Sequence, residues 1–119
     1  MTLAGKLALI TGAASGVGLS TARLFAEQES DLILVDISEK IIEITSELTD
    51  NFPLCKITSY VVDITDGKQV EDLFENIKKM YKRVVTLVVN SAGIARGCKV
   101  IILIFIYFIF YLLNGFIKW

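Results

Sequence analysis

Short apolar runs alternate with amphipathic segments along most of the chain. The runs Leu7–Thr11 (LALIT) and Leu32–Asp36 (LILVD) are almost continuously apolar, which is typical of parallel strands buried on both faces. Residues 55–64 (CKITSYVVDI) supply a third strand, and residues 84–90 (VVTLVVN) a fourth. The pattern therefore predicts four strands separated by longer segments.

The segments between these runs have the spacing of amphipathic helices. The first, residues 17–29, is expected to bury one face made of Val17, Thr21, Ala22, Leu24, Phe25 and Ala26. The second, residues 38–52, has Ser38 as its expected N-cap, and its inward positions are Ile41, Ile42, Ile44 and Leu48.

The third helical segment has the clearest pattern in the chain. Asp66 is a suitable N-cap, and apolar side chains then follow at i, i+3, i+4 and i+7, at Val70, Leu73, Phe74, Ile77 and Tyr81. Strands and helices thus alternate in the order βαβαβαβ. Because crossovers between parallel strands are right-handed, this order predicts an α/β fold, a doubly wound parallel sheet with helices on both faces.

Composition limits the size of the protein and its partners. With 119 residues, of which 54% are hydrophobic, the chain is long enough for one domain with a core. The net charge is -1 and charges are interspersed, so we expect no nucleic-acid partner. Cys55 and Cys98 stand apart in a chain without histidine, which favours reduced thiols and no metal site. The start MTLAGKLALITG lacks leader features, which favours the cytoplasm or the mitochondrial matrix.

Three glycines lie at the junction between the first strand and the first helix, within ITGAASGVG. The N-terminus of a helix carries unpaired N–H groups and partial positive charge, so such a junction is a natural seat for a pyrophosphate. Gly12, Gly16 and Gly18 remove Cβ atoms where the turn tightens, where a phosphate would meet the backbone, and where the helix packs on the sheet.

Three motifs give the chain a family resemblance. TGAASGVG (residues 11–18) matches the T-G-x-x-x-G-x-G cofactor loop of the short-chain dehydrogenase/reductase family, VDI (62–64) resembles its adenine-contacting D-[VI] pair, and NSAG (90–93) resembles its N-N-A-G motif. The branch of 3-oxoacyl carrier-protein reductases and hydroxysteroid dehydrogenases is the most similar. The likeness covers residues 1–97, and Ser91 departs from the second Asn of N-N-A-G. It implies a partial, truncated Rossmann-type domain followed by an unrelated tail.

The resemblance also implies a set of cofactor-binding residues. Asp36 would accept hydrogen bonds from an adenosine ribose and repel a 2'-phosphate. Because Ser15 and Ile37 supply no cation beside it, NAD is expected rather than NADP. Asp63 would bond the adenine amino group. The full set is Thr11, Gly12, Ser15, Gly16, Val17, Gly18, Asp36, Ile37, Asp63, Ile64, Asn90, Ala92 and Gly93.

A purely structural role is open to each of these residues as well. Asp36 could cap the next helix, Asp63 could form a turn, and Asn90 and Gly93 could simply end a strand.

The family's acid/base pair, Tyr-x-x-x-Lys, is missing from these 119 residues. The residues four positions after Tyr60, Tyr81, Tyr107 and Tyr111 are Ile64, Val85, Tyr111 and Gly115. Without a proton partner for hydride transfer, we expect no catalytic residue here and no turnover by this chain alone. The resemblance implies an oxidoreductase acting on a carbonyl or secondary alcohol, such as a 3-oxoacyl or hydroxysteroid substrate. The second hypothesis is a non-catalytic dinucleotide-binding fragment.

Residues 98–119 form an apolar tail unlike the family, with an uninterrupted apolar run from Val100 to Leu113. Fourteen helical residues span about 21 Å against a bilayer core of about 30 Å, so a membrane anchor would need residues 100–117. The same run is compatible with a buried strand or helix on the sheet edge, and with an aberrant C-terminus. The sequence does not predict an oligomeric state.

Overall fold

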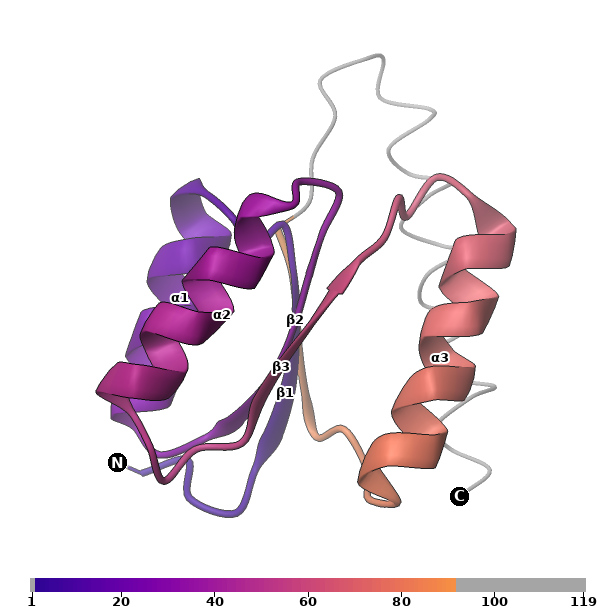
Figure 1. Cartoon of the computed structure of the whole chain (residues 1–119). Coiled ribbons are helices and arrows are strands. Elements are labelled where there is room, and N and C mark those ends of the chain that lie inside the picture. Colours follow the sequence, from indigo (N-terminus) through magenta and orange to yellow (C-terminus); the bar gives the residue numbers. More distant parts are fainter. Residues whose placement is uncertain (1, 92–119) are drawn as a thin grey trace. The chain divides into compact units, whose positions relative to one another are not determined.

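The computed structural model describes residues 2–91, so the predicted tail lies outside the described residues. Strands and helices alternate as the hydrophobic pattern predicts (Figure 1). In chain order the elements are β1 (Leu7–Thr11), α1 (Gly16–Glu27), β2 (Asp31–Asp36), α2 (Lys40–Asn51), β3 (Ile57–Val61), α3 (Gly67–Tyr81) and β4 (Leu87–Asn90).

These elements belong to two compact units. The first contains the four strands with α1 and α2, and the second contains α3 and the turns beside it, residues 62–84. Within the first unit the strands form one sheet in the order β3-β2-β1-β4, and every pairing in it is parallel. The predicted α/β fold with a partial Rossmann-like parallel sheet is therefore confirmed.

The two central strands are buried along nearly their whole length, as their apolar runs predict. Every residue of β1 is buried, and only the two end residues of β2, Asp31 and Asp36, are partly exposed. The edge strands are shorter than predicted, with β3 ending at Val61 and β4 beginning at Leu87. Pairing with the central strands sets both limits. The last pair between β3 and β2 is that of Val61 with Asp36, and the first pair between β4 and β1 is that of Leu87 with Ala8.

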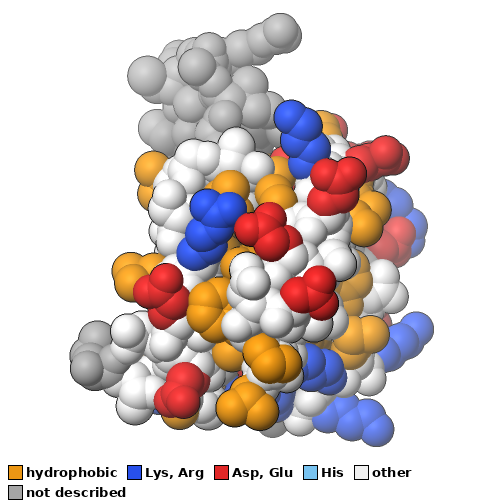
Figure 2. All heavy atoms as spheres, turned by 60° about the vertical axis from the view of Figure 1, so that its left-hand side comes forward, with side chains coloured by type: hydrophobic (Ala, Val, Ile, Leu, Met, Phe, Trp, Pro, Cys, Tyr) orange, Lys and Arg blue, Asp and Glu red, His pale blue; other side chains and the backbone are white. Residues whose placement is uncertain are grey.

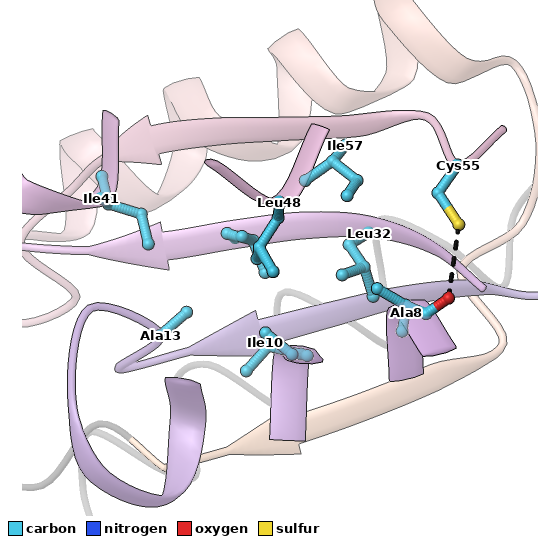
Figure 3. Packing of buried hydrophobic residues seen from close by; sticks show 11 residues of the cluster. Ala8, Ile10, Ala13, Leu32, Ile41, Leu48, Cys55 and Ile57 are labelled. Carbon is cyan, nitrogen blue, oxygen red and sulfur yellow. Dashed lines mark hydrogen bonds between the residues drawn. The ribbon is translucent and has the colours of Figure 1, made fainter. Parts of the chain in front are cut away.

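Helices α1 and α2 cover the same face of the sheet (Figure 1). Alternate strand residues point into this layer, among them Ala8 and Ile10 of β1 and Leu32 of β2, and they pack with Ile41 and Leu48 of α2 (Figure 3). The core of the first unit thus sits between the sheet and these helices.

The buried face of α1 differs from the predicted one. Gly18, Ala22 and Ala26 are its buried residues, whereas Val17 and Leu24 are 72% and 54% exposed. Small side chains at i, i+4 and i+8 let α1 approach the sheet closely. The helix therefore turns this stripe toward the sheet and leaves Val17 and Leu24 on its exposed side. Phe25 lies at the margin of the core.

One prediction for α2 was wrong. Ile42 is 57% exposed, while Ile44 packs at the edge of the core. The helix begins at Lys40, with Glu39 just before it in the N-cap position, and Glu39 makes no side-chain cap hydrogen bond. The capping hydrogen bond comes from Ser38, as predicted, because its hydroxyl accepts the N–H of Lys40 at 3.3 Å.

Helix α1 ends in a Schellman motif. The N–H of Ser30 donates to the carbonyl of Phe25 at 3.1 Å, and the N–H of Glu29 donates to that of Ala26 at 3.0 Å. Glu29 takes the left-handed position of the motif, with φ 71°. Glycine is the usual residue there, so Glu29 carries local backbone strain.

In the second unit, α3 confirms its prediction in detail. Its buried residues are those that the spacing predicts, Val70, Leu73, Phe74, Ile77 and Tyr81, and its N-cap is Asp66. The Asp66 carboxylate accepts the N–H of Lys68 at 3.1 Å and the side-chain amide of Gln69 at 3.0 Å. The predicted placement of helices on both faces of the sheet stays a prediction for α3.

Candidate dinucleotide-binding site

The carboxyl ends of three strands meet beside the glycine-containing loop. Thr11, the last residue of β1, is in register with Val35 of β2 and with Asn90 of β4. The chain leaves β1 into the loop of residues 12–15 and then enters α1. Because β2 and β4 lie on opposite sides of β1, this is the switch point at which open parallel sheets bind ligands.

Two loop glycines have left-handed backbone conformations. Gly12 has φ 67° and Gly16 has φ 55°, values that residues with a Cβ rarely adopt. A Cβ on Gly16 would find no atom within 4 Å. The space beside Gly16 is therefore open, as its predicted role as the place of phosphate approach requires.

Gly18 is required for a different reason. A Cβ there would collide with the carbonyl group of Gly12, whose carbon would lie at 2.6 Å, and with Oγ of Ser91. The first turn of α1 is thus packed directly on the backbone of the loop and on the end of β4. The sequence predicted that the helix packs on the sheet at Gly18, and the structure identifies the contacting groups as the Gly12 carbonyl and the Ser91 hydroxyl.

The N-terminus of α1 keeps its positive character. Its N-cap, Ser15, is extended and makes no side-chain cap hydrogen bond, and its first turn contains no acidic residue. The first N–H groups of a helix have no intrahelical acceptor, and the side chain of Ser15 accepts a hydrogen bond from none of them. Val17, which was expected in the core, lies exposed in this turn.

Asp36 links the end of β2 to the glycine loop. Its Oδ2 accepts the N–H of Ala14 at 2.9 Å, and its Oδ1 accepts the N–H of Ser38 at 2.9 Å. Asp36 is partly buried, and it is not the N-cap of α2, which is Glu39. Its neighbour Ile37 is 65% exposed. The capping role considered for Asp36 is therefore wrong, and sequence reasoning missed the contact with Ala14.

The end of β4 is tied to β1 by side chains. The buried Thr11 donates from Oγ1 to Oδ1 of Asn90 at 2.7 Å. Ser91 donates to the carbonyl of Thr11 from Oγ at 2.5 Å and from its N–H at 3.3 Å. Ser91, which the sequence marks only as a departure from N-N-A-G, thus has a defined structural contact.

The remaining predicted site residues lie in the second unit or outside the described residues. Asp63 and Ile64 belong to the second unit. Asp63 accepts the N–H of Thr65 at 2.9 Å and its hydroxyl at 2.7 Å, so it forms the turn before α3, which is the structural role that its residue type allows. Its contact with adenine stays a prediction. Ala92 and Gly93 lie outside the described residues.

Tyr60 has the wrong environment for a proton donor at neutral pH. Burial raises the pKa of its phenol, whereas the family's chemistry requires a lowered value. Burial also raises the pKa of the Cys55 thiol, with a smaller contribution from Asp31. This thiol donates to the carbonyl of Ala26 at 3.6 Å, drawn as the dashed line in Figure 3. Cys55 belongs to the buried core of the first unit.

Residues 2–91 contain no group of histidine, cysteine or carboxylate side chains placed to hold a metal ion. Within that range no helix is long and apolar enough to cross a bilayer. On the face shown in Figure 2, acidic and basic side chains are interspersed with apolar ones.

These residues fit the pyrophosphate of a dinucleotide. The helix end is uncapped by side chains, the Gly16 position is open, and a carboxylate stands at the end of the neighbouring strand. Backbone N–H groups would hold the phosphates, and Asp36 would face the ribose next to them.

The chain is similar to known proteins. The family model described as short chain dehydrogenase matches residues 6–103. The chain is 38% identical over 101 residues to a 3-oxoacyl-[acyl-carrier-protein] reductase of Thermotoga maritima, covering 85% of this chain and 40% of that protein. It is 36% identical over 90 residues to an NAD-dependent glycerol dehydrogenase of Listeria innocua, covering 76% of this chain and 34% of that protein. The chain therefore spans well under half the length of these relatives.

Solved structures have the same fold. A short chain dehydrogenase from Mycobacterium smegmatis superposes with a TM-score of 0.70 at 31% identity, over 77% of this chain and 38% of that one. L-sorbose reductase from Gluconobacter frateurii, solved with NADPH and L-sorbose, superposes with a TM-score of 0.82 at 22% identity, over 96% of this chain and 48% of that one. With the motif order, the sheet topology and the family match in agreement, the chain belongs to the short-chain dehydrogenase family.

Proposed function

We propose that residues 1–97 are the dinucleotide-binding half of an NAD-dependent oxidoreductase of the short-chain type. The observation that carries this proposal is the junction of β1 and α1, where an uncapped helix N-terminus and the open Gly16 position meet the carboxylate of Asp36. The bound cofactor would supply hydride transfer. The described residues would bind it and orient its adenosine end.

The preference for NAD rests on the charge and surroundings of Asp36. A 2'-phosphate placed about 4 Å from this carboxylate costs about 4 kcal/mol per unit charge pair at an effective dielectric of about 20, as an upper figure. About 1.4 kcal/mol already corresponds to a tenfold preference. Ser15 and Ile37, the positions next to the loop and to Asp36, carry no compensating cation.

The similar proteins include users of both cofactors. The L-sorbose reductase structure contains NADPH, whereas the Listeria innocua relative is named as NAD-dependent. Asp36 is therefore the residue on which the proposed choice of NAD depends.

We propose a carbonyl or secondary alcohol as the substrate class of the whole enzyme, in line with the names of the reductase and dehydrogenase relatives. The present 119 residues contain no Tyr-x-x-x-Lys, so this chain is expected to bind NAD without turnover. A non-catalytic dinucleotide-binding fragment is the second candidate, because these 119 residues lack that pair.

Calorimetric titration of the full chain with NAD and NADP tests the cofactor assignment. Tighter binding of NAD is expected, and Asp36→Ala should narrow the difference between the two affinities. Asp31→Ala is a matched control, because Asp31 lies on the same strand and its carboxylate also accepts a backbone N–H, that of Lys56 at 2.7 Å. This control should leave the preference unchanged. Tighter binding of NADP by the unmutated chain would overturn the assignment.

A further inference from the structure

Two hydrogen bonds join the loop between Gly12 and Gly16 to β2. Both of these glycines have positive φ, and glycine loses more conformational entropy on ordering than any other residue. The N–H of Ala13 reaches the carbonyl of Val35 at 3.3 Å, a long hydrogen bond. The N–H of Ala14 reaches Oδ2 of Asp36 at 2.9 Å. The shorter and charge-assisted bond is thus the one to Asp36.

Asp36 is itself fixed in place. It ends β2 in register with Val61 of β3, and its Oδ1 accepts the N–H of Ser38 at 2.9 Å. The two carboxylate oxygens therefore point in defined directions, one to the loop and one to the turn before α2. The end of β2 thus holds the loop at Ala14 through this one side chain.

These two contacts leave hydrogen-bond acceptor positions unused on the Asp36 carboxylate. An ionised carboxylate has about four acceptor positions on its two oxygens. The N–H groups of Ala14 and Ser38 use one on each oxygen, so a further acceptor position stays on each. A ribose diol has two hydroxyls to donate. Asp36 can therefore keep both backbone bonds while it accepts both hydroxyls.

We propose that Asp36 is a positioning residue for the glycine loop in addition to its proposed role at the ribose. By holding Ala14, its carboxylate keeps the loop and the N-terminus of α1 in the conformation that receives the pyrophosphate. This inference rests on the proposed function for its ligand. The contact with Ala14 itself exists without any ligand, so it is testable separately.

Hydrogen exchange of the full chain, followed by NMR without ligand, tests the contact. In Asp36→Ala, protection of the Ala14 and Ser38 amides should fall by about tenfold or more, as expected for loss of a bond to a charged group. The amides of Leu9 and Leu34, in the central strands, report whether the sheet is intact. Asp31→Ala, which removes the same charge from the other end of β2, should leave Ala14 protected. Unchanged protection of Ala14 in Asp36→Ala would overturn the proposal.

Asp36→Asn is a second variant for the case in which Asp36→Ala does not fold. It keeps the side-chain volume but replaces one oxygen with an NH2 donor, so it can accept only one of the two N–H groups. Protection should fall at Ala14 or at Ser38. Unaltered protection at both amides would contradict the proposal.

Titration with inorganic pyrophosphate separates positioning from ribose binding, because this probe has no ribose. If Asp36 serves the ribose alone, removing its negative charge should leave pyrophosphate affinity equal or higher. A positioning role predicts instead that Asp36→Ala binds pyrophosphate more weakly. The amide shifts of Gly16, Val17 and Gly18 should then saturate at a severalfold higher pyrophosphate concentration in Asp36→Ala than in the unmutated chain or Asp31→Ala. Equal or tighter binding by Asp36→Ala would overturn the proposal. Failure of the unmutated chain to bind pyrophosphate would instead contradict the proposed function, while the exchange result decides the positioning role.

Discussion

Gly18→Ala is the substitution whose effect the structure defines most closely. The added Cβ would lie 2.6 Å from the carbonyl carbon of Gly12 and would collide with its oxygen and with Oγ of Ser91. Neither neighbour can withdraw freely. Gly12 is backbone in a left-handed conformation, and Oγ of Ser91 is held by its hydrogen bond to the carbonyl of Thr11.

The expected magnitude combines three terms. Overpacking at a close contact costs about 1–3 kcal/mol, and loss of the Ser91 hydrogen bond costs about 1 kcal/mol. Alanine in place of glycine within a helix returns about 1 kcal/mol. The free energy of unfolding should therefore fall by about 1–3 kcal/mol, although Gly→Ala inside a helix is ordinarily stabilising.

Urea unfolding of the full chain, in a mild detergent where solubility requires it, measures this change. Ser91→Ala alone is the matched control, because it removes the hydrogen bond to the carbonyl of Thr11 without adding a Cβ at Gly18. Ser91→Ala in the Gly18→Ala background should recover part of the loss, since it removes one of the colliding groups. A Gly18→Ala chain as stable as the unmutated one, or more stable, would refute the packing of α1 on the loop.

Three further predictions concern other positions. Gly16→Val places a β-branched side chain at φ 55° in the open space of the proposed phosphate approach, so calorimetry should show a loss of NAD affinity, and unchanged affinity would reject that role. Glu29→Gly relieves the left-handed residue of the α1 Schellman motif and should raise the free energy of unfolding by about 0.5–1 kcal/mol in urea titrations; a decrease would contradict the strain. Hydrogen bonds from Gln69 and Lys68 lower the pKa of Asp66 below its ordinary value of 3.8. The stabilising effect of the Asp66 carboxylate is therefore present above pH 3.8 and is lost as the pH falls through the lowered pKa. The difference in unfolding free energy between the unmutated chain and Asp66→Ala should accordingly be smaller below pH 3.8 than at pH 7.

Sequence-based prediction succeeded best where the residues at helical or strand spacing are also the large apolar residues that become buried. In α3 the apolar residues recur at helical intervals and are all large, so the buried stripe and the Asp66 cap followed from the sequence. The buried strands were predicted for a similar reason, because a strand that is buried on both faces appears in the sequence as a continuous apolar run.

The prediction failed where small residues decide packing. Hydrophobicity placed Val17 and Leu24 in the core, but the buried stripe of α1 is made of glycine and alanine. Close approach of helix to sheet outweighs the burial of larger side chains, and periodicity does not measure that distance. The alanines and glycine at i, i+4 and i+8 were the available signal.

The candidate site was predictable as a set of residues but not as a set of contacts. The motifs identify Asp36 and the three glycines, because each has a recognisable place at a strand end or a turn. The bond from Ala14 to Asp36 and that from Ser91 to Thr11 depend on how neighbouring strand ends meet in space. Neither contact has a periodic signature, so only the folded structure shows them.

NAD titration of the full chain followed residue by residue through backbone amide shifts tests the central claim most directly. If the junction of β1 and α1 holds the dinucleotide, the largest shifts should fall on Gly16, Val17 and Gly18 and on Ala14 beside Asp36. Amides near Asp31, at the other end of β2, should change little. Saturable shifts centred away from the glycine loop, or no shifts at millimolar NAD in a folded chain, would contradict the account.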